Sequence, residues 1–316
     1  MATTKHASRI AIIGAGTIGI SLAALHLTHM QNFRQLTIVD IRADLRAYID
    51  ESIPRYLPAS LHHLISAIRT TSSVQQAVQD ADYVQECGPE SLEFKKQLWA
   101  EIEHHAPLHT LFWTSTSGIA ASKQNVMLRD PSRLLVVHPF NPPHILPLLE
   151  IVPSPETSQA AVDETFAFWK HKMEREPVVL RREVTGFVAG RLAWILLREA
   201  IHLVNQGVVD VDQLDIILQN SMGPRWAYAG PFKSFHAGGG PGGLQALFDN
   251  VGGTIQSCWD DAGLIKFCDG SGWEQQICER VSKIYGKADL DERDAANKAV
   301  LEAVANEVKD GTEARH

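Results

Sequence analysis

The first half of the chain alternates short apolar runs with longer stretches of helical periodicity. The apolar runs, which read as buried strands, are 10–13, 36–39, 83–84, 111–113, 134–137 and 177–180. Between most of them lie amphipathic stretches such as 91–105, in which Leu92, Leu98 and Ile102 recur near helical spacing. Strands that alternate with helices in this way predict a mostly parallel sheet covered on both faces.

The pattern changes near Thr185. One strong apolar stripe of helical spacing runs through 186–206 and consists of Val188, Leu192, Ile195, Leu196, Ala200, Leu203 and Val204. Gly207 follows as a C-cap glycine would, and no clear strand comes after it. The sequence therefore predicts an α/β domain over 1–184 and an all-α domain over 185–316. The charged, Ala-rich tail after Asp289 is typical of a solvated helix.

Composition sets limits on the class of protein. With 316 residues, 45% of them hydrophobic, the chain is long enough for two domains with full cores. The net charge of −8 argues against nucleic acid or an anionic membrane as a main partner. The four cysteines match no zinc spacing, so we expect no metal site. The chain shows no membrane-length apolar run, no signal peptide and no C-terminal SKL, which favours the cytoplasm.

A glycine fingerprint lies directly after the first predicted strand. Residues 14–19 read G-A-G-T-I-G, which matches G-x-G-x-x-G and opens a predicted helix over 17–27. Gly14 permits the tight turn, Gly16 lets the backbone approach a pyrophosphate, and Gly19 lets the helix pack close to the sheet. The N–H groups of the first helical turn, at Thr17 and Ile18, are then available to phosphates. This context predicts a Rossmann-type, doubly wound nucleotide-binding domain.

An acidic residue completes that fingerprint. Asp40 comes 21 residues after Gly19, at the end of the second predicted strand. A carboxylate at this place accepts hydrogen bonds from the adenosine ribose and repels the extra phosphate of NADP. The sequence therefore favours NAD, although the cation Arg42 stands close enough to weaken that preference. A second match at Gly238, Gly240 and Gly243 follows no predicted strand, and Pro241 lies inside it, so a flexible loop is the better interpretation.

Two predicted strand ends offer residues for proton chemistry. His138 follows the strand at 134–137, and Glu150 lies twelve residues further on, across a proline-rich turn. A carboxylate that touches an imidazole fixes its tautomer and stabilises its charged form. Ligands bind beyond the carboxyl ends of such strands, but from spacing alone a structural histidine is equally compatible. Ser117, after the strand at 111–113, fits a helix cap or a substrate contact.

These features together resemble the 3-hydroxyacyl-CoA dehydrogenase superfamily over nearly the whole chain. The resemblance is closest to the branch of lambda-crystallin (L-gulonate 3-dehydrogenase) and L-carnitine dehydrogenase. It rests on these segments: Gln85 to Glu90 followed by Lys95, Thr114 to Gly118, His138 to Pro143 with Glu150, and Gly186-Phe187 with Arg191. No Tyr-x-x-x-Lys motif supports the alternative short-chain dehydrogenase chemistry.

The resemblance assigns roles to individual residues. It implies that His138 is the catalytic base, that Glu150 is its partner, and that Ser117 binds the substrate oxygen. It also implies that Glu90 and Lys95 contact the cofactor. The family usually has Asn where this chain has Gly190, which leaves substrate identity open.

Arg225 gives a second clue to the substrate. Arg225 stands where the small-substrate branch carries Arg, and a guanidinium suits a free carboxylate, although a surface cation is the plain alternative. The expected function is therefore an NAD-dependent oxidoreductase that interconverts a 3-hydroxy acid and its 3-keto form. The alternatives are a reductase of a bulkier ketone, a 3-hydroxyacyl-CoA dehydrogenase, and a crystallin-like NAD-binding protein without catalysis. Relatives also imply a homodimer formed through the helical domain.

Overall fold

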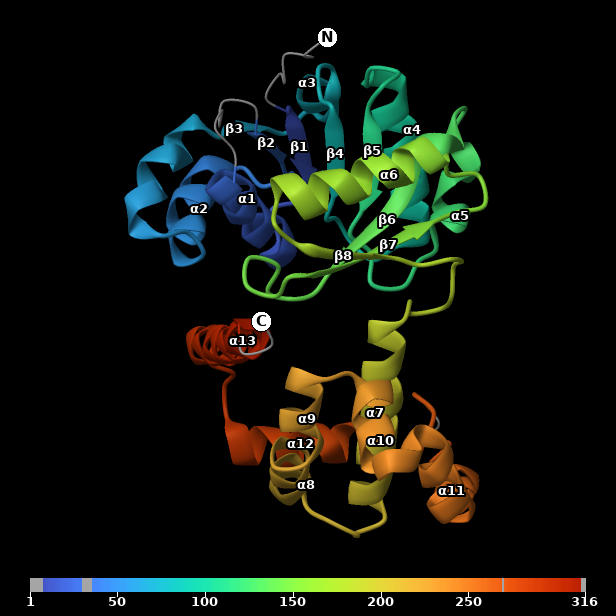
Figure 1. Ribbon diagram of the computed structural model, residues 1–316. Helices are drawn as coiled ribbons and strands as arrows, with labels where there is room; N and C mark the ends of the chain where they lie inside the picture. Colours follow the sequence, from blue (N-terminus) through green and yellow to red (C-terminus); the bar gives the residue numbers. More distant parts are fainter. Residues whose placement is uncertain (1–7, 30–35, 269, 314–316) are drawn as a thin grey trace. The chain divides into compact units, whose positions relative to one another are not determined.

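An eight-stranded sheet organises the N-terminal part of the computed structural model (Figure 1). The structure describes residues 8–29, 36–268 and 270–313, with side chains as far as residue 306. The strands are β1 (Ile10–Ile13), β2 (Leu36–Val39), β3 (Arg69–Thr71), β4 (Tyr83–Glu86), β5 (Leu111–Thr114), β6 (Leu134–Pro139), β7 (Leu148–Pro153) and β8 (Glu176–Val179). They lie in the order β3-β2-β1-β4-β5-β6-β7-β8.

The strand directions confirm the predicted doubly wound fold and add one antiparallel pair. All neighbouring strands from β3 to β6 run parallel, and β7 runs antiparallel to β6. β8 is parallel to β7. The sequence did not predict β3, because its three polar residues, Arg69 to Thr71, carry no apolar signal and are at most half-buried.

Two apolar cores lie on the two faces of the sheet, because successive strand side chains point to opposite sides. Ile10 and Ile12 face one core, whereas Ala11 and Ile13 face the other. Helices α1 (Thr17–His29) and α6 (Gln159–Ala167) cover the first face (Figure 1). Helices α3 (Val74–Val78), α4 (Leu92–His105) and α5 (Ala121–Gln124) cover the second. Helix α2 (Leu45–Ser52) follows β2.

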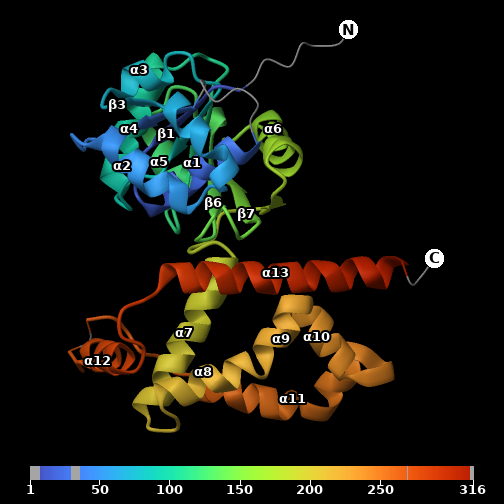
Figure 2. The same cartoon turned by 90° about the vertical axis from the view of Figure 1, so that its left-hand side faces the viewer.

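The chain divides into two units, the first ending at Arg191 and the second beginning at Leu192. The division falls inside α7 (Ala189–Asn205). The described residues of the second unit contain helices and no strand, as the sequence predicts (Figures 1 and 2). Its helices are α8 (Val211–Gln219), α9 (Met222–Tyr228), α10 (Pro231–Gly238), α11 (Gly243–Asp261), α12 (Trp273–Tyr285) and α13 (Leu290–Glu313).

The long apolar helix starts later than the sequence indicates. The stripe predicts a helix from residue 186, but α7 begins at Ala189. Gly186 and Phe187 have φ of 74° and 52°, in the left-handed region that a right-handed helix cannot contain. At the other end, Gly207 has φ of 70° and follows the last turn, as a C-cap glycine does.

The second glycine-rich segment is a tight corner between helices instead of a flexible loop. α10 ends at Gly238, a single turn of 3₁₀-helix covers Gly240–Gly242, and α11 begins at Gly243. A Cβ at Gly239 would lie 1.7 Å from the carbonyl oxygen of Gly243. The glycines therefore serve close helix packing, and no strand feeds into them.

None of the helices in the described residues combines the length and the apolar character needed to cross a membrane.

Candidate functional site

The glycine turn between β1 and α1 has the geometry that its sequence predicts. Gly14 has φ of 102°, and a Cβ there would lie 2.7 Å from the carbonyl oxygen of Cys87. A Cβ at Gly19 would lie 2.0 Å from the carbonyl oxygen of Gly14. Both positions therefore require glycine, the first for its backbone conformation and the second for the close approach of α1 to the turn.

The face of this turn that points away from the sheet is open. A Cβ at Gly16 would meet nothing within 4 Å, and Thr17 is exposed at the first position of α1. Ile18, in the same turn, is half-buried. The first N–H groups of a helix have no carbonyl partner inside it and carry its positive dipole end. The turn thus fits the pyrophosphate of a dinucleotide.

Asp40 lies just beyond β2, next to the glycine turn. Its Oδ2 accepts a hydrogen bond from the backbone N–H of Ala15 at 2.7 Å, and its Oδ1 accepts one from the N–H of Arg42 at 3.0 Å. Each carboxylate oxygen has a further lone pair that can accept a ribose hydroxyl. The acid and the glycine turn therefore form one continuous surface that suits the adenosine end of NAD.

A buried ion pair joins the end of β4 to α4. The carboxylate of Glu86 accepts two hydrogen bonds of 2.8 Å from Lys95 Nζ, and one of 2.8 Å from Thr114 Oγ1. It also accepts the N–H of Gly88 at 2.7 Å. Glu86 and Lys95 are essentially inaccessible. Sequence reasoning assigned Glu86 no role, although an acidic residue at the end of an apolar strand was a visible signal.

Glu90 connects this ion pair to the turn that carries Ser117. Its Oε2 lies 3.6 Å from Lys95 Nζ, and its Oε1 accepts the N–H groups of Ser117 and Gly118, each at 3.2 Å. The same oxygen accepts the hydroxyl of Thr116. Ser117 itself is exposed. The sequence did not foresee that Glu90 holds the Ser117 turn in place, because the two lie 27 residues apart.

His138 and Glu150 meet because β6 and β7 pair in antiparallel register. The register places His138 directly opposite Glu150, so their side chains share one face of the sheet. His138 Nδ1 lies 2.9 Å from Glu150 Oε2, and both residues are buried. A carboxylate only accepts, so the proton lies on Nδ1 and Nε2 carries the free lone pair.

The second oxygen of Glu150 joins this pair to α7. Glu150 Oε1 accepts the N–H groups of Val188 and Ala189, each at 2.9 Å. Burial raises the pKa of the Glu150 carboxyl, but the hydrogen bonds from His138, Ala189 and Val188 outweigh it and leave the pKa below its usual value. The ring of the buried Phe187 packs 5.4 Å from that of His138. The carboxylate therefore stays charged beside the imidazole.

The other two predicted substrate residues, Gly190 and Arg225, belong to different units of the chain. Gly190 is buried in the first turn of α7, directly after Ala189. Arg225 is exposed on α9 in the second unit, and its guanidinium makes no hydrogen bond or ion pair with the residues that the structure describes. Arg225 is therefore a cation without a structural partner in the described part of the chain.

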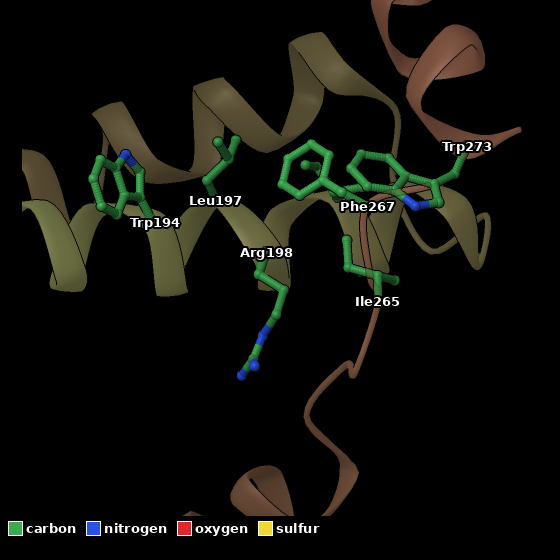
Figure 3. A pocket seen from close by; sticks show the side chains of 7 residues that line it. Trp194, Leu197, Arg198, Ile265, Phe267 and Trp273 are labelled. Carbon is green, nitrogen blue, oxygen red and sulfur yellow. The ribbon is translucent and has the colours of Figure 1, made fainter. Parts of the chain in front are cut away.

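The second unit also contains a pocket that the sequence did not indicate (Figure 3). Its volume is about 440 Å³, and it is lined by Trp194, Leu197, Arg198, Ile265, Phe267 and Trp273, together with Ile201. Aromatic and aliphatic side chains dominate it, and none of the predicted site residues lines it.

Comparisons with known proteins identify the family of this chain. The model of the 3-hydroxyacyl-CoA dehydrogenase NAD-binding domain matches residues 9–184, and that of the C-terminal domain matches residues 186–261. The chain is 35% identical to L-carnitine dehydrogenase of Nocardiopsis dassonvillei over 263 residues, which are 81% of this chain and 79% of that protein. It is 33% identical to the lambda-crystallin homolog of Bos taurus over 288 residues, covering 88% and 81%.

A solved structure shares the fold. The crystal structure of 5-formyl-3-hydroxy-2-methylpyridine 4-carboxylic acid 5-dehydrogenase, an NAD⁺-dependent dismutase, matches with a TM-score of 0.74 and 23% identity. The match covers 95% of this chain and 99% of that one. The chain therefore belongs to the 3-hydroxyacyl-CoA dehydrogenase family and is an NAD-dependent oxidoreductase that acts on a hydroxyl group.

Proposed function

We propose that this enzyme interconverts a small 3-hydroxy acid, of the carnitine or gulonate type, and its 3-keto form. The observation that carries the proposal is the buried pair of His138 and Glu150, with 2.9 Å between Nδ1 and Oε2. A base for a secondary alcohol must take a proton while hydride leaves the same carbon. An imidazole whose Nδ1 is tied to a carboxylate leaves Nε2 for that task.

The reaction divides among three side chains. His138 takes the hydroxyl proton at Nε2 during oxidation and returns it to the keto oxygen during reduction. Glu150 stabilises the imidazolium that forms, and the hydroxyl of Ser117 orients the substrate oxygen. NAD, when bound, supplies the hydride acceptor.

The proposed cofactor contacts are made by the glycine turn, Asp40 and Glu90. The pyrophosphate fits the open turn at Gly16, Thr17 and Ile18, and Asp40 accepts the ribose hydroxyls. Glu90, whose side chain is 47% exposed, is available for a direct contact. Lys95 is buried against Glu86, so we propose that its charge acts on the cofactor through Glu90.

We propose that Arg225 binds the free carboxylate of the substrate. Its exposed guanidinium can form paired hydrogen bonds with a free carboxylate. Arg225→Ala should raise KM for the hydroxy acid about 30-fold or more, the loss expected of a charge-assisted pair. An unchanged KM would remove Arg225 from the substrate site.

The direct test is a turnover screen in which NADH fluorescence is the readout. The protein is offered NAD with L-carnitine, L-gulonate, 3-hydroxybutyrate and 3-hydroxybutyryl-CoA in separate reactions. We expect turnover of a free acid that is abolished in His138→Gln, while the Kd for NADH changes less than about twofold. His109→Gln, at an exposed histidine, is the matched control and should behave as wild type. Activity with the CoA ester alone would contradict the assignment of Arg225, and normal turnover in His138→Gln would contradict the mechanism.

Gly190 favours a second candidate, the reduction of a bulkier ketone. This buried position follows Ala189, whose N–H binds Glu150, and it places no side chain beside the catalytic pair. Bulky ketones are therefore included in the screen with NADH. If they are the substrates, Gly190→Asn should reduce their turnover and leave small acids less affected.

We also propose that the second unit forms a homodimer. Among its described residues only three large apolar side chains are buried: Ile201, Val204 and Trp273. Phe232 and Trp259 are 80% and 69% exposed, and they border an apolar hollow of about 580 Å³ between α10 and α11. Apolar area of this kind is typical of a protein interface. Phe235 lines the same hollow, so sedimentation equilibrium of wild type and Phe235→Asp tests the proposal. The variant should be monomeric, whereas a monomeric wild type would exclude the dimer.

A further inference from the structure

Arg42 is a cation at a position where an NAD site has no phosphate to bind. It follows Asp40 by two residues, and a cation at the end of the second strand commonly receives the 2′-phosphate of NADP. In this structure its guanidinium is already engaged. Arg42 Nε donates to Asp44 Oδ1 at 2.9 Å, and the guanidinium carbon lies 3.5 Å from the centre of the Tyr48 ring.

The two partners hold Arg42 from both sides. Asp44 precedes the first residue of α2, and Tyr48 lies one turn into that helix, so both belong to a rigid element. The hydrogen bond to Asp44 raises the pKa of Arg42, and the same bond lowers the pKa of Asp44. Both groups are thus charged at neutral pH, and the carboxylate cancels the local positive charge. The backbone N–H of Arg42 also donates to Asp40, which keeps this acid in place.

We propose that Asp44, together with Tyr48, withholds Arg42 from a 2′-phosphate, so that rejection of NADP depends on two carboxylates, Asp40 and Asp44. Asp40 repels the phosphate directly, and Asp44 removes the cation that would otherwise attract it. The proposal concerns the nucleotide site and is independent of the substrate.

The test measures binding without turnover. Fluorescence titration gives the Kd of NADPH and of NADH for wild type, Asp44→Asn and the double variant Asp40→Ser/Asp44→Asn. Freeing the guanidinium in Asp44→Asn should tighten NADPH binding about fivefold, as expected for release from an exposed ion pair, with NADH nearly unchanged. The double variant should move the ratio of the two affinities about 100-fold toward NADPH, because it also removes the direct repulsion.

The same helix offers a matched control. Arg46 and Asp50 form a second ion pair on α2, with a 3.0 Å bond from Nε to Oδ2 and similar exposure. Asp50→Asn removes an equal charge and should leave NADPH affinity unchanged. Arg42→Met/Asp44→Asn should lose the gain of Asp44→Asn. An NADPH Kd in Asp44→Asn within twofold of wild type, an equal gain in Asp50→Asn, or a gain that survives without Arg42 would each overturn the proposal.

Discussion

The two units of this chain bury their apolar side chains to very different degrees. In the first unit every strand except the edge strands β3 and β8 is almost wholly buried, and Trp99, Trp113 and Trp169 are inaccessible. In the second, Trp194, Trp226 and Trp259 are all more than 40% exposed. Helices alone do not make a core, since each needs a surface against its apolar stripe. The first unit supplies both surfaces itself, whereas the described residues of the second unit leave large apolar side chains exposed.

The same contrast appears in the two matches to G-x-G-x-x-G. The first lies between strand β1 and helix α1, next to Asp40, whereas the second lies at the corner between α10 and α11, where no strand precedes it. Whether a G-x-G-x-x-G segment can bind a nucleotide therefore depends on the strand and helix that flank it. The proposed catalytic pair lies in the unit whose core is complete, where a rigid sheet can hold catalytic groups within tenths of an ångström.

The largest expected effect tests whether the chemistry belongs to the sheet of the first unit. Glu150→Gln keeps the shape of the side chain but removes the charge that stabilises the imidazolium, so kcat should fall about 10³-fold or more. Steady-state kinetics with the substrate found in the screen measure this. Glu176→Gln, at an exposed carboxylate on β8, is the control and should retain full activity. A Glu150→Gln enzyme with wild-type kcat would show that the pair is only structural.

The next effect compares the two glycine motifs. Gly19→Ala places a Cβ within 2.0 Å of a backbone oxygen, so the free energy of unfolding should fall by about 3 kcal/mol or more. Gly16→Ala meets no atom within 4 Å and should keep its stability within about 0.5 kcal/mol, yet bind NADH at least about tenfold more weakly.

Gly238→Ala in the second motif serves as control for both measurements. Its Cβ would make only an ordinary 3.4 Å contact with Leu247. Urea unfolding should find stability close to wild type, and fluorescence titration should find an unchanged Kd for NADH. Weaker NADH binding in this variant would contradict the proposal that only the first motif binds the cofactor.

The third prediction concerns the pH dependence of stability, which we attribute to a histidine in the core of the first unit. His26 on α1 is wholly buried with Nε2 3.1 Å from Gln85 Oε1, and burial lowers its pKa to about 4. Between pH 6.5 and 4 the unfolded chain binds a proton that the native chain does not. Stability therefore falls as the pH falls through this window, by about 3 kcal/mol in total from this group.

Urea unfolding across that pH range measures the contribution. His26→Asn has no group that titrates there, so its free energy of unfolding should fall less steeply from pH 6.5 to 4 than that of wild type. Parallel curves for the two proteins would show that folding does not lower the pKa of His26.

The smallest expected effect is a dependence of hydrogen-exchange protection on protein concentration. If a second copy covers the apolar stripes, amides of the second unit should lose protection on dilution, by about 1 kcal/mol for each tenfold step, whereas β1 to β6 should not change. Hydrogen exchange at several protein concentrations measures both units in one sample. Protection in the second unit that is independent of concentration would mean that its apolar surface has no second copy upon it.

The sequence by itself determined the fold class and the nucleotide site, because both depend on local signals. Apolar runs of two to four residues predict six of the eight strands, and the glycines at 14–19 with Asp40 lie at fixed offsets from two of them. The helical second half likewise follows from apolar spacing over 186–206. β3 was not predicted because its three polar residues show no hydrophobic pattern. The start of α7 was predicted too early because apolar spacing does not report the backbone conformation of Gly186 and Phe187.

Tertiary structure alone decided how the site is held together. The antiparallel register of β6 and β7 sets His138 opposite Glu150, and the N–H groups of Val188 and Ala189 fix the second carboxylate oxygen. Glu86 likewise meets Lys95 and Thr114 only through the pairing of β4 with β5 and the packing of α4. A sequence states which residues are present, but register and packing determine which of them lie within hydrogen-bonding distance.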